Sequence, residues 1–438
     1  MRRELYKSLL NWKKEKDRKP LIIEGARQVG KTWLLKQFGK NEYENVCYVR
    51  CDNNPQLETV FSDYDIPRVI RSLSAVTDVT IKEETTLIIF DEIQECPKAL
   101  TSLKYFDEDA PGYHVAAAGS LLGLMDHYGS GFPVGKVDTF TLYPLSFMEF
   151  LDAMGKEILI QEIKEHRWEE MNALGPQLKE LLRQYYYTGG MPDVVLSYIQ
   201  EQDLKKVRRI QKRILRDCNK DISKHAPKND IPKINMIWNS IPSQLAKENR
   251  KFIYGAVKTG GRAKEFENAL QWLLDAGLVY KVNRVKKVMM PLKYYEDMEC
   301  FKLYVVDLGL LGAMAGASAN EILADDNCFS SYKGSFTEQY IAQQFYSSYT
   351  ESEDLFYHTN ENSTLEIDFV VQMSEIYPIE VKAEENLKSK SLSTLLKSNN
   401  RLYGIRFSMS PYREQERMVN VPLALAEEYF RSLDEKSE

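Results

Sequence analysis

The chain has 438 residues, of which 43% are hydrophobic and 28% are charged, and its formal net charge is −6. This length is too great for one compact core, so two or three domains are expected, and the composition argues against disorder over long stretches. The acidic balance argues against a protein that coats nucleic acid over its whole surface.

The cysteines and the apolar runs predict a soluble cytoplasmic protein. The six cysteines form no C-x-x-C pair and no zinc-like spacing, which is typical of free thiols in a reducing compartment. Residues 1–12 have the pattern of an amphipathic helix without the apolar core of a signal peptide. No apolar run approaches the roughly 18 residues needed to span a bilayer, so no membrane partner is expected.

Residues 25–32 read Gly-Ala-Arg-Gln-Val-Gly-Lys-Thr and fit the Walker A pattern G-x-x-x-x-G-K-[ST]. An apolar run precedes this loop and a helical pattern follows it, which is the strand–loop–helix order of a phosphate-binding loop. Its glycines let backbone N–H groups converge on phosphate oxygens at the positive end of the helix. We therefore predict an ATP site in which Lys31 binds the terminal phosphates and Thr32 ligates Mg²⁺. The residues expected to hold the nucleotide are Gly25, Ala26, Arg27, Gln28, Val29, Gly30, Lys31 and Thr32.

A second apolar strand, residues 86–90, is followed by an acidic pair and has the pattern of a Walker B strand. At its end, Asp91 is expected to hold Mg²⁺ opposite Thr32. Glu92 is expected to polarise the attacking water. Because Glu92 directly follows Asp91, it is better placed to activate water than a substrate hydroxyl as the acceptor of the phosphoryl group. A small-molecule kinase is therefore the less favoured interpretation.

Two further strands complete the first fold prediction. Residues 113–118 form a strand that leads to Ser120, a candidate sensor of the γ-phosphate and equally a candidate cap of the helix that begins at Leu121. Residues 46–49 form another buried strand. Alternation of buried strands with helices predicts an α/β fold with a doubly wound parallel sheet and helices on both faces.

The middle of the chain is strongly basic. Residues 201–288 contain 21 Lys and Arg against 9 Asp and Glu, a net charge of +12 that leaves −18 for the remainder. A basic amphipathic helix is followed by a short helix near 243–247, a longer helix over 262–277 and a basic strand pair. This order is the outline of a winged-helix domain, and it favours DNA as a partner through residues 201–288. The open alternative is a protein contact, because charge runs usually form solvated faces.

The C-terminal part of the chain carries a second candidate site. Glu338 lies on an expected helix, Asp368 on a strand with alternating apolar residues, and Glu380 with Lys382 on the next strand. This set resembles the PD-(D/E)xK nuclease core, although its aspartate comes from the preceding strand and no Pro-Asp pair stands before Glu380. The resemblance implies that Glu338, Asp368 and Glu380 hold Mg²⁺ and that Lys382 orients the attacking water. Such folds are also retained as binding modules without activity.

Five motifs occur in the order found in a widespread prokaryotic family of AAA-type ATPases, related to archaeal and STAND-like P-loop proteins, which this chain resembles over nearly its whole length. They are Gly-Ala-Arg-Gln-Val-Gly-Lys-Thr, Phe-Asp-Glu-Ile-Gln, Ala-Gly-Ser-Leu-Leu, Tyr-Pro-Leu-Ser-Phe-Met-Glu-Phe and Tyr-Thr-Gly-Gly-Met-Pro. With the local patterns, the resemblance implies four regions: an AAA-type P-loop core at 1–150, a helical lid at 151–200, a basic winged-helix-like domain at 201–320 and a restriction-nuclease-like α/β domain at 325–438.

The family usually has Gly-Arg before the Tyr-Pro-Leu-Ser motif, where this chain has Gly135 and Lys136. Lysine cannot make the forked contact of a guanidinium, and Arg27 is the other basic candidate near the phosphates, so the finger residue stays open. A missing finger in the same chain would need a neighbouring subunit, which makes an oligomer a candidate state.

Two functions follow from these patterns. In the first, ATP hydrolysis is coupled to DNA binding or processing through the winged helix and the nuclease-like domain. In the second, the chain is an ATP-driven switch or scaffold for a protein partner, and the nuclease-like fold is inactive.

Overall fold

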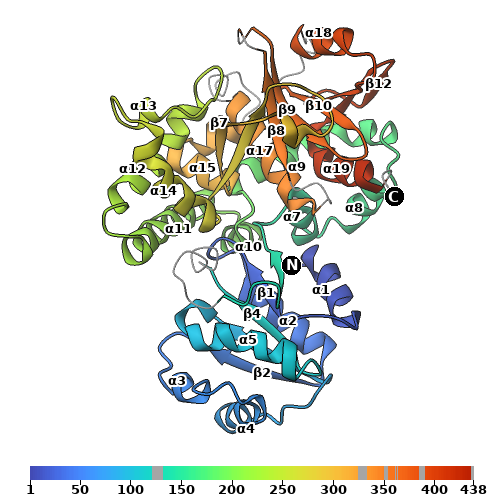
Figure 1. Ribbon diagram of the computed structural model, residues 1–438. Helices are drawn as coiled ribbons and strands as arrows, with labels where there is room; N and C mark the ends of the chain where they lie inside the picture. Colours follow the sequence, from blue (N-terminus) through green and yellow to red (C-terminus); the bar gives the residue numbers. More distant parts are fainter. Residues whose placement is uncertain are drawn as a thin grey trace. The chain divides into compact units, whose positions relative to one another are not determined.

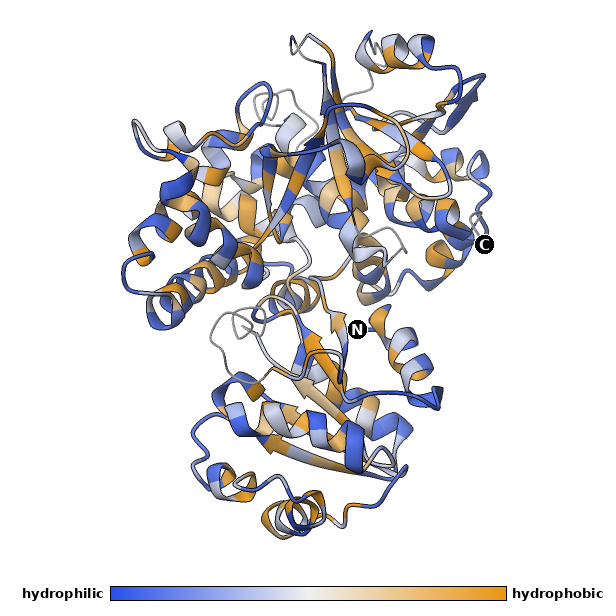
Figure 2. Cartoon of the chain, in the orientation of Figure 1, coloured by the Kyte–Doolittle hydropathy of each residue, from blue (hydrophilic) through white to orange (hydrophobic). Residues whose placement is uncertain are grey.

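The computed structural model describes residues 1–120, 132–323, 333–349, 354–360, 364–383 and 390–435, together with Asn362. These residues form two compact units (Figure 1). The smaller unit contains Arg2–Tyr143 and Asp275–Gly277, and the larger contains Pro144–Leu274 and Leu278–Glu438. In each unit, hydrophobic residues concentrate in the strands of a central sheet (Figure 2).

The smaller unit is built on a five-stranded sheet in which every neighbouring pair is parallel, as predicted. Two of its strands, β3 and β4, are buried along their whole length, because helices cover both faces of a doubly wound sheet. The sheet order is β2-β3-β4-β1-β5. The strands are β1 (Leu21–Glu24), β2 (Asn45–Arg50), β3 (Thr86–Asp91), β4 (His114–Ala118) and β5 (Asp138–Thr141).

Helices supply the two apolar layers of the smaller unit. On one face, Leu73 of α4 and Leu103 of α5 share a core with Phe90 of β3. Elsewhere, Phe38 of α2 packs against the ring of Trp12 of α1, with ring centroids 6.5 Å apart. The helical elements are α1 (Leu5–Lys14), α2 (Lys31–Glu42), α3 (Gln56–Val60), α4 (Ile66–Thr77), η1 (Ile93–Glu95) and α5 (Pro97–Asp109).

The edge strand of the smaller unit, β5 (Asp138–Thr141), was not predicted from the sequence. Three of its four residues are polar and none is fully buried, and they pair with β1 from Leu21 opposite Asp138 to Glu24 opposite Thr141. An edge strand with one neighbour needs no continuous apolar run, so hydrophobic periodicity does not reveal it. Its position matters because the next residue, Leu142, contacts the loop that follows β1.

The first residue of β4, His114, predicts an acid sensitivity of the smaller unit. Its side chain is 4% exposed, and its Nδ1 lies 2.7 Å from the Tyr43 hydroxyl oxygen. Burial, together with the charges of Arg18 and Lys13, lowers its pKa from 6.5 to about 4. Because the unfolded chain takes up this proton at higher pH, the free energy of unfolding should fall by up to about 3 kcal/mol as the pH drops from about 6.5 to about 4.

Urea denaturation at several pH values measures this effect in the wild type and in His114→Gln. The variant should lose that part of the pH dependence. The same loss of stability between pH 6.5 and pH 4 in both proteins would contradict the assignment to His114.

The larger unit is built on an eight-stranded mixed sheet with the order β12-β13-β11-β10-β9-β8-β6-β7. The hairpin predicted around Asp368 and Glu380 is formed by β9 and β10, which pair antiparallel. The strands are β6 (Val279–Val285), β7 (Glu296–Val305), β8 (Leu355–Thr359), β9 (Glu366–Gln372), β10 (Ile376–Val381), β11 (Gly404–Ser408), β12 (Arg413–Gln415) and β13 (Met418–Pro422).

A central helix, α17, joins the helical part of the larger unit to this sheet. Its buried glutamines contact backbone groups of other segments: Val305 N–H donates to Gln339, and Leu308 N–H donates to Gln343, each at 2.9 Å. In the described part of the chain, no helix is long and apolar enough to cross a membrane. The helical elements are α7 (Phe147–Ala153), α8 (Glu157–Lys164), η3 (Glu170–Leu174), α9 (Gly175–Thr188), α10 (Pro192–Glu201), α11 (Leu204–His225), α12 (Ile231–Leu245), α13 (Tyr254–Val257), α14 (Ala263–Asp275), η4 (Leu292–Tyr295), α15 (Leu308–Ala315), α16 (Ala319–Leu323), α17 (Lys333–Ser347), α18 (Lys390–Ser398), η6 (Leu423–Leu425) and α19 (Ala426–Glu435).

The strand pair expected to be the wing of a winged helix has a different role in the structure. The pair was expected within residues 280–288, where the structure has the single strand β6, which pairs instead with β7 from residue 296 on. Both strands belong to the eight-stranded sheet, because β6 pairs parallel with β8 from Asn283 opposite Phe356 to Val285 opposite His358. The expected short helix near 243–247 is largely the end of the 15-residue α12. One sheet therefore runs through the predicted regions 201–320 and 325–438, and the structure does not show a separate winged-helix domain.

The last two sequence motifs of the family resemblance meet inside the larger unit. Leu145 N–H donates to the carbonyl oxygen of Gly190 at 2.7 Å, and Gly190 N–H donates to Asp307 at 2.6 Å. A Cβ atom on Gly190 would lie 2.0 Å from the carbonyl oxygen of Leu145, so this approach requires glycine. These motifs therefore have a structural role in joining three segments of the larger unit.

Candidate functional site

The loop between β1 and α2 adopts a conformation that its glycines make accessible. Gly25 has φ 127° and Gly30 has φ 101°, values that L side chains rarely adopt. A Cβ atom on Gly25 would lie 2.2 Å from the carbonyl oxygen of Leu142, so a larger residue would collide with the backbone. The loop therefore wraps at the carboxyl end of β1, directly before α2 begins at Lys31.

The Lys31 ammonium lies inside this loop. Its Nζ donates to the carbonyl oxygens of Gly25 and Ala26, each at 2.8 Å, and the side chain is buried. Burial lowers the pKa of Lys31 from 10.5 to about 8, against the opposing effect of the Glu92 and Asp91 carboxylates. The group is therefore still largely cationic at pH 7, and it is the main positive charge available to an anion in the loop.

A chain of side chains links the loop to the neighbouring strands. The Thr32 hydroxyl donates to Asp91 Oδ1 at 2.8 Å, and the Tyr48 hydroxyl of β2 donates to Asp91 Oδ2 at 2.7 Å. The structure thus brings together the predicted pair Thr32 and Asp91. Tyr48 was missed, because only the register of β2 beside β3, with Arg50 opposite Asp91, shows that it reaches this carboxylate.

The next residue, Glu92, has a constrained backbone and a held carboxylate. Its φ is 52°, in the left-handed region that is uncommon for residues other than glycine. Its Oε2 accepts from Gln94 Nε2 at 2.6 Å and from the Ser120 hydroxyl at 3.4 Å. Ser120, predicted as a sensor, therefore lies beside Glu92, and Gln94 is a contact that the sequence analysis did not predict. The helix expected to begin at Leu121 lies outside the described residues.

A buried arginine that precedes α1 donates a hydrogen bond to the backbone of the loop between β1 and α2. Arg3 is 5% exposed; its Nη1 donates to the carbonyl oxygen of Val29 at 2.8 Å and its Nη2 to that of Tyr143 at 2.5 Å. A single arginine in an amphipathic N-terminal pattern gives no signal of this role, so the sequence analysis missed it.

These groups fit a nucleoside triphosphate with a divalent cation. The hydroxyl of Thr32 and the carboxylate of Asp91 are hard oxygen ligands of the kind that Mg²⁺ prefers. The glycine loop leaves its inner surface free of side-chain bulk, and a helix N-terminus and an ammonium face the same region. The donor set is therefore chemically suited to Mg²⁺ and phosphate oxygens.

The predicted nuclease-like residues are distributed differently. Glu338 of α17 is buried, and its Oε2 accepts from the Tyr304 hydroxyl at 2.9 Å and from Lys302 Nζ at 3.3 Å. Its Oε1 accepts from Arg250 Nη1. Lys302 Nζ also lies 2.8 Å from Glu366 Oε1. Glu338 is therefore neutralised by two cations of the protein itself.

Of the other two predicted carboxylates, Asp368 lies beside Glu338, whereas Glu380 has separate partners. Asp368 accepts from the backbone N–H of Val381 at 2.7 Å, and burial together with the Glu338 charge raises its pKa to about 8. Glu380 is paired with Arg406 at 3.4 Å and with Lys382 at 3.2 Å. Over the described ranges, no three His, Cys, Asp or Glu side chains are arranged to hold a metal ion. The predicted assembly of Glu338, Asp368 and Glu380 around one ion is thus not what the structure shows.

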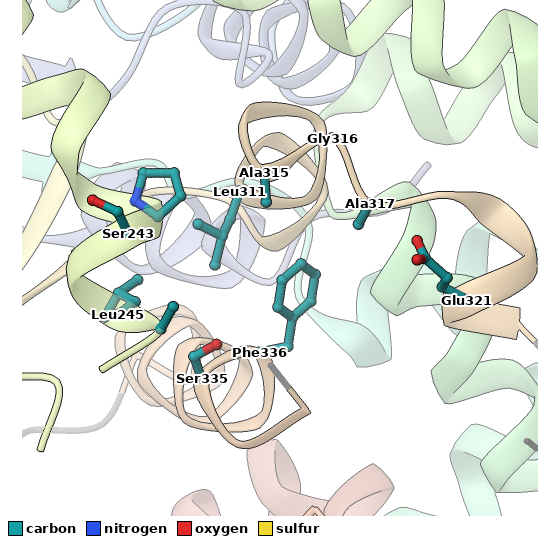
Figure 3. A pocket seen from close by; sticks show the side chains of 11 residues that line it. Ser243, Leu245, Leu311, Ala315, Gly316, Ala317, Glu321, Ser335 and Phe336 are labelled. Atoms are coloured by element: carbon teal, nitrogen blue, oxygen red, sulfur yellow. The ribbon is translucent and has the colours of Figure 1, made fainter. Parts of the chain in front are cut away.

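The larger unit also contains a cavity of about 350 Å³, whose lining has neither a phosphate-binding loop nor a group of carboxylates (Figure 3). Leu245, Leu311 and Phe336 contribute to its apolar lining. Its one charged lining residue, Glu321, accepts from the backbone N–H of Ser318 at 2.7 Å at the start of α16. The cavity therefore offers apolar surface and no free catalytic group.

The first of these sites lies in a segment that matches a known family. Residues 17–151 match the family model described as an AAA domain. The smaller unit contains an AAA-type P-loop ATPase domain. Residues 179–321 and 333–426 match two domains of unknown function, DUF8612 and DUF4143, whose descriptions name no activity. No curated protein matches the chain.

Solved structures similar to the chain include archaeal proteins. A Walker-type ATPase of Pyrococcus abyssi is 14% identical with a TM-score of 0.45, covering 72% of this chain and 95% of its own. The ORC2 protein of Aeropyrum pernix in its ADP form is 14% identical with a TM-score of 0.34, covering 72% and 93%. The ORC1 protein of Aeropyrum pernix, solved in complex with DNA, is 12% identical with a TM-score of 0.29, covering 72% and 90%. At these TM-scores, the similarities assign no activity or partner to this chain.

The two basic candidates for a finger in the AAA domain lie in different environments. Lys136 Nζ is 3.3 Å from Asp107 Oδ2 and 3.1 Å from Glu108 Oε1, at the end of α5. Arg27 is exposed on the phosphate-loop segment. The charge of Lys136 is thus already paired with two carboxylates of α5.

Proposed function

We propose that the AAA domain binds ATP with Mg²⁺ and hydrolyses it. The observation that carries this proposal is the 2.8 Å contact between the Thr32 hydroxyl and Asp91. Thr32 of the loop and Asp91 of the strand, the two residues expected to bind Mg²⁺, are in contact. Thr32 directly follows Lys31, whose ammonium is buried. This is the arrangement by which P-loop enzymes hold a nucleotide and its metal ion.

Each residue of the site has a defined task in this proposal. Thr32 and Asp91 would hold Mg²⁺, which neutralises charge on the phosphates when bound. Lys31 binds the terminal phosphates and stabilises the charge that develops during transfer. The Glu92 carboxylate orients the attacking water and accepts its proton, while Ser120 and Gln94 hold that carboxylate in place.

Release of inorganic phosphate from ATP without any added acceptor tests this function. The purified full chain should release phosphate with Mg²⁺ and should stop when the metal is removed with EDTA. ADP formation that requires an added hydroxyl substrate, with the phosphoryl group transferred to that hydroxyl and no inorganic phosphate released, would instead indicate a kinase, and no turnover under either condition would contradict the proposal.

Tyr48 gives a prediction that separates metal positioning from folding. Tyr48→Phe removes the hydroxyl that donates to Asp91 Oδ2 but keeps the ring, which packs under the Lys36 ammonium at 3.5 Å. Loss of such a supporting contact typically costs 10- to 100-fold in metal affinity or activity. The Mg²⁺ concentration for half-maximal turnover should therefore rise by about tenfold or more, with an unchanged melting temperature as the control. An unchanged magnesium dependence would remove Tyr48 from this role.

We propose further that nucleotide state is coupled to DNA through the basic helix α11. Lys205, Arg208 and Lys212 line a surface cavity of about 360 Å³. Within the described structure, the ammonium groups of Lys205 and Lys212 form no ion pair, whereas Lys206 is paired with Glu201. The two unpaired groups are therefore available to phosphates of a nucleic acid backbone.

A pair of double variants tests this surface by gel shift over a salt series. Lys205→Ala with Lys212→Ala should weaken DNA binding and reduce the slope of log affinity against log salt by about 1.8, because each lost phosphate contact removes about 0.9. The control is Lys206→Ala with Arg213→Ala, whose cations are paired with Glu201 and Asp193 and should contribute less. Equal slopes for the wild type and the first variant would favour the alternative function, an ATP-driven switch for a protein partner.

A further inference from the structure

The larger unit contains a buried ammonium that lies between carboxylates of two elements. Lys302 of β7 is 0% exposed. Its Nζ is 3.3 Å from Glu338 Oε2 of α17 and 2.8 Å from Glu366 Oε1 of β9. A fully buried charge is costly unless opposite charges surround it, so this position is built for a cation.

A divalent metal ion would need the space that this ammonium fills. Mg²⁺ and Ca²⁺ bind carboxylate oxygens at about 2.0–2.6 Å, so an ion shared by Glu338 and Glu366 would lie between the same two oxygens. It would also meet the charge of Arg250, which binds the other oxygen of Glu338. The carboxyl group of Asp368 also faces this cluster. The Lys302 ammonium nevertheless occupies the position between the two glutamates, and an added ion of charge +2 would be repelled by both Lys302 and Arg250.

The second half of the predicted nuclease motif is also satisfied internally. The Lys382 ammonium, which would have to orient a water molecule in a nuclease, lies 3.2 Å from Glu380 Oε1. Arg406 approaches the other oxygen of Glu380 at 3.4 Å. The cations and carboxylates of this region therefore form two ion-paired groups.

We propose that Lys302 is a built-in cation that replaces a divalent metal ion in the Glu338–Glu366 cluster. The larger unit then carries out no metal-dependent cleavage of nucleic acid at this cluster. This inference is independent of the ATPase function, because it concerns residues of the larger unit alone.

Titration with Mn²⁺, followed by electron paramagnetic resonance on the full chain, tests the proposal. All proteins carry Asp91→Asn, so that the strand ligand of the ATPase site is removed. This background protein and its Glu338→Gln derivative should bind Mn²⁺ equally weakly. Adding Lys302→Ala should create a site with at least tenfold higher Mn²⁺ affinity, and Glu338→Gln should abolish that gain. Lys281→Ala on the neighbouring strand β6 is the matched control and should create no site.

Two results would overturn the proposal. The first is Mn²⁺ binding, or metal-dependent plasmid nicking, by the background protein that disappears in Glu338→Gln. The second is a folded Lys302→Ala protein, judged by circular dichroism, that gains no Mn²⁺ affinity. Because Lys302→Ala leaves a buried charge unpaired, Lys302→Gln provides a second variant of similar length. If Lys302→Ala does not fold, the same gain in Mn²⁺ affinity is expected of Lys302→Gln, and its absence in the folded protein would overturn the proposal equally.

Discussion

Replacement of Lys31 by alanine should abolish tight ATP binding and with it all turnover. The ammonium is the main positive charge inside the loop, and alanine has no group that can bind the terminal phosphates. Hydrogen bonds to charged groups and donors that stabilise transferring phosphoryl groups are worth on the order of 3 kcal/mol, so affinity should fall at least about 100-fold. Binding of a fluorescent ATP analogue measures the loss.

The control for this variant is Lys40→Ala on the same helix α2. Lys40 is exposed near the end of the helix, so its removal changes the net charge equally without touching the loop. It should leave affinity unchanged. Because Lys31 also holds the carbonyl oxygens of Gly25 and Ala26, the melting temperature of Lys31→Ala should be measured as well. ATP affinity close to that of the wild type in a folded Lys31→Ala protein would contradict the assigned role.

Replacement of Glu92 by glutamine should separate binding from hydrolysis. Glutamine keeps the length and an oxygen that can accept from Gln94 and Ser120, but it cannot take the proton of the attacking water. General base catalysis of this kind contributes about 10²- to 10⁴-fold, so turnover should drop by that factor while ATP affinity stays within a fewfold of the wild type. Phosphate release and nucleotide retention on the same preparation provide both numbers.

Glu95→Gln is a matched control for the charge change, because Glu95 lies three residues further along, in η1. Turnover of this protein should remain near the wild-type rate. Wild-type turnover in Glu92→Gln would remove Glu92 from the role of base and direct attention to another group near Ser120.

The sequence alone predicted the parts of the fold and site that depend on local patterns. The buried strands β1 to β4 and the loop before Lys31 were accessible because continuous apolar runs and a fixed glycine spacing are local signals. The edge strand β5 could not be predicted, since a segment of four residues with one apolar side chain, Phe140, resembles any surface segment. Arg3 and Tyr48 were missed because each reaches the site only through tertiary structure.

In the larger unit, local patterns predicted secondary-structure elements but not the arrangement of their side chains. The helix that carries Glu338 and the hairpin that carries Asp368 and Glu380 were predicted, yet their carboxylates do not converge on one ion. The reason lies in Lys302, which is 36 residues from Glu338 in the sequence and lies on β7, outside the segment 280–288 that was expected to form the basic wing. Pairing of β6 with β8 brings that strand into the sheet, and no local pattern reveals a parallel pairing across some 70 residues.

Calorimetric titration of ATP into the full chain, with and without Mg²⁺, tests the central claim most directly. The account predicts saturable binding to one site that is tightened by Mg²⁺ in the wild type, and a much weaker magnesium effect in Asp91→Asn. Absence of binding heat at several temperatures, or identical titrations of both proteins with and without the metal, would contradict it.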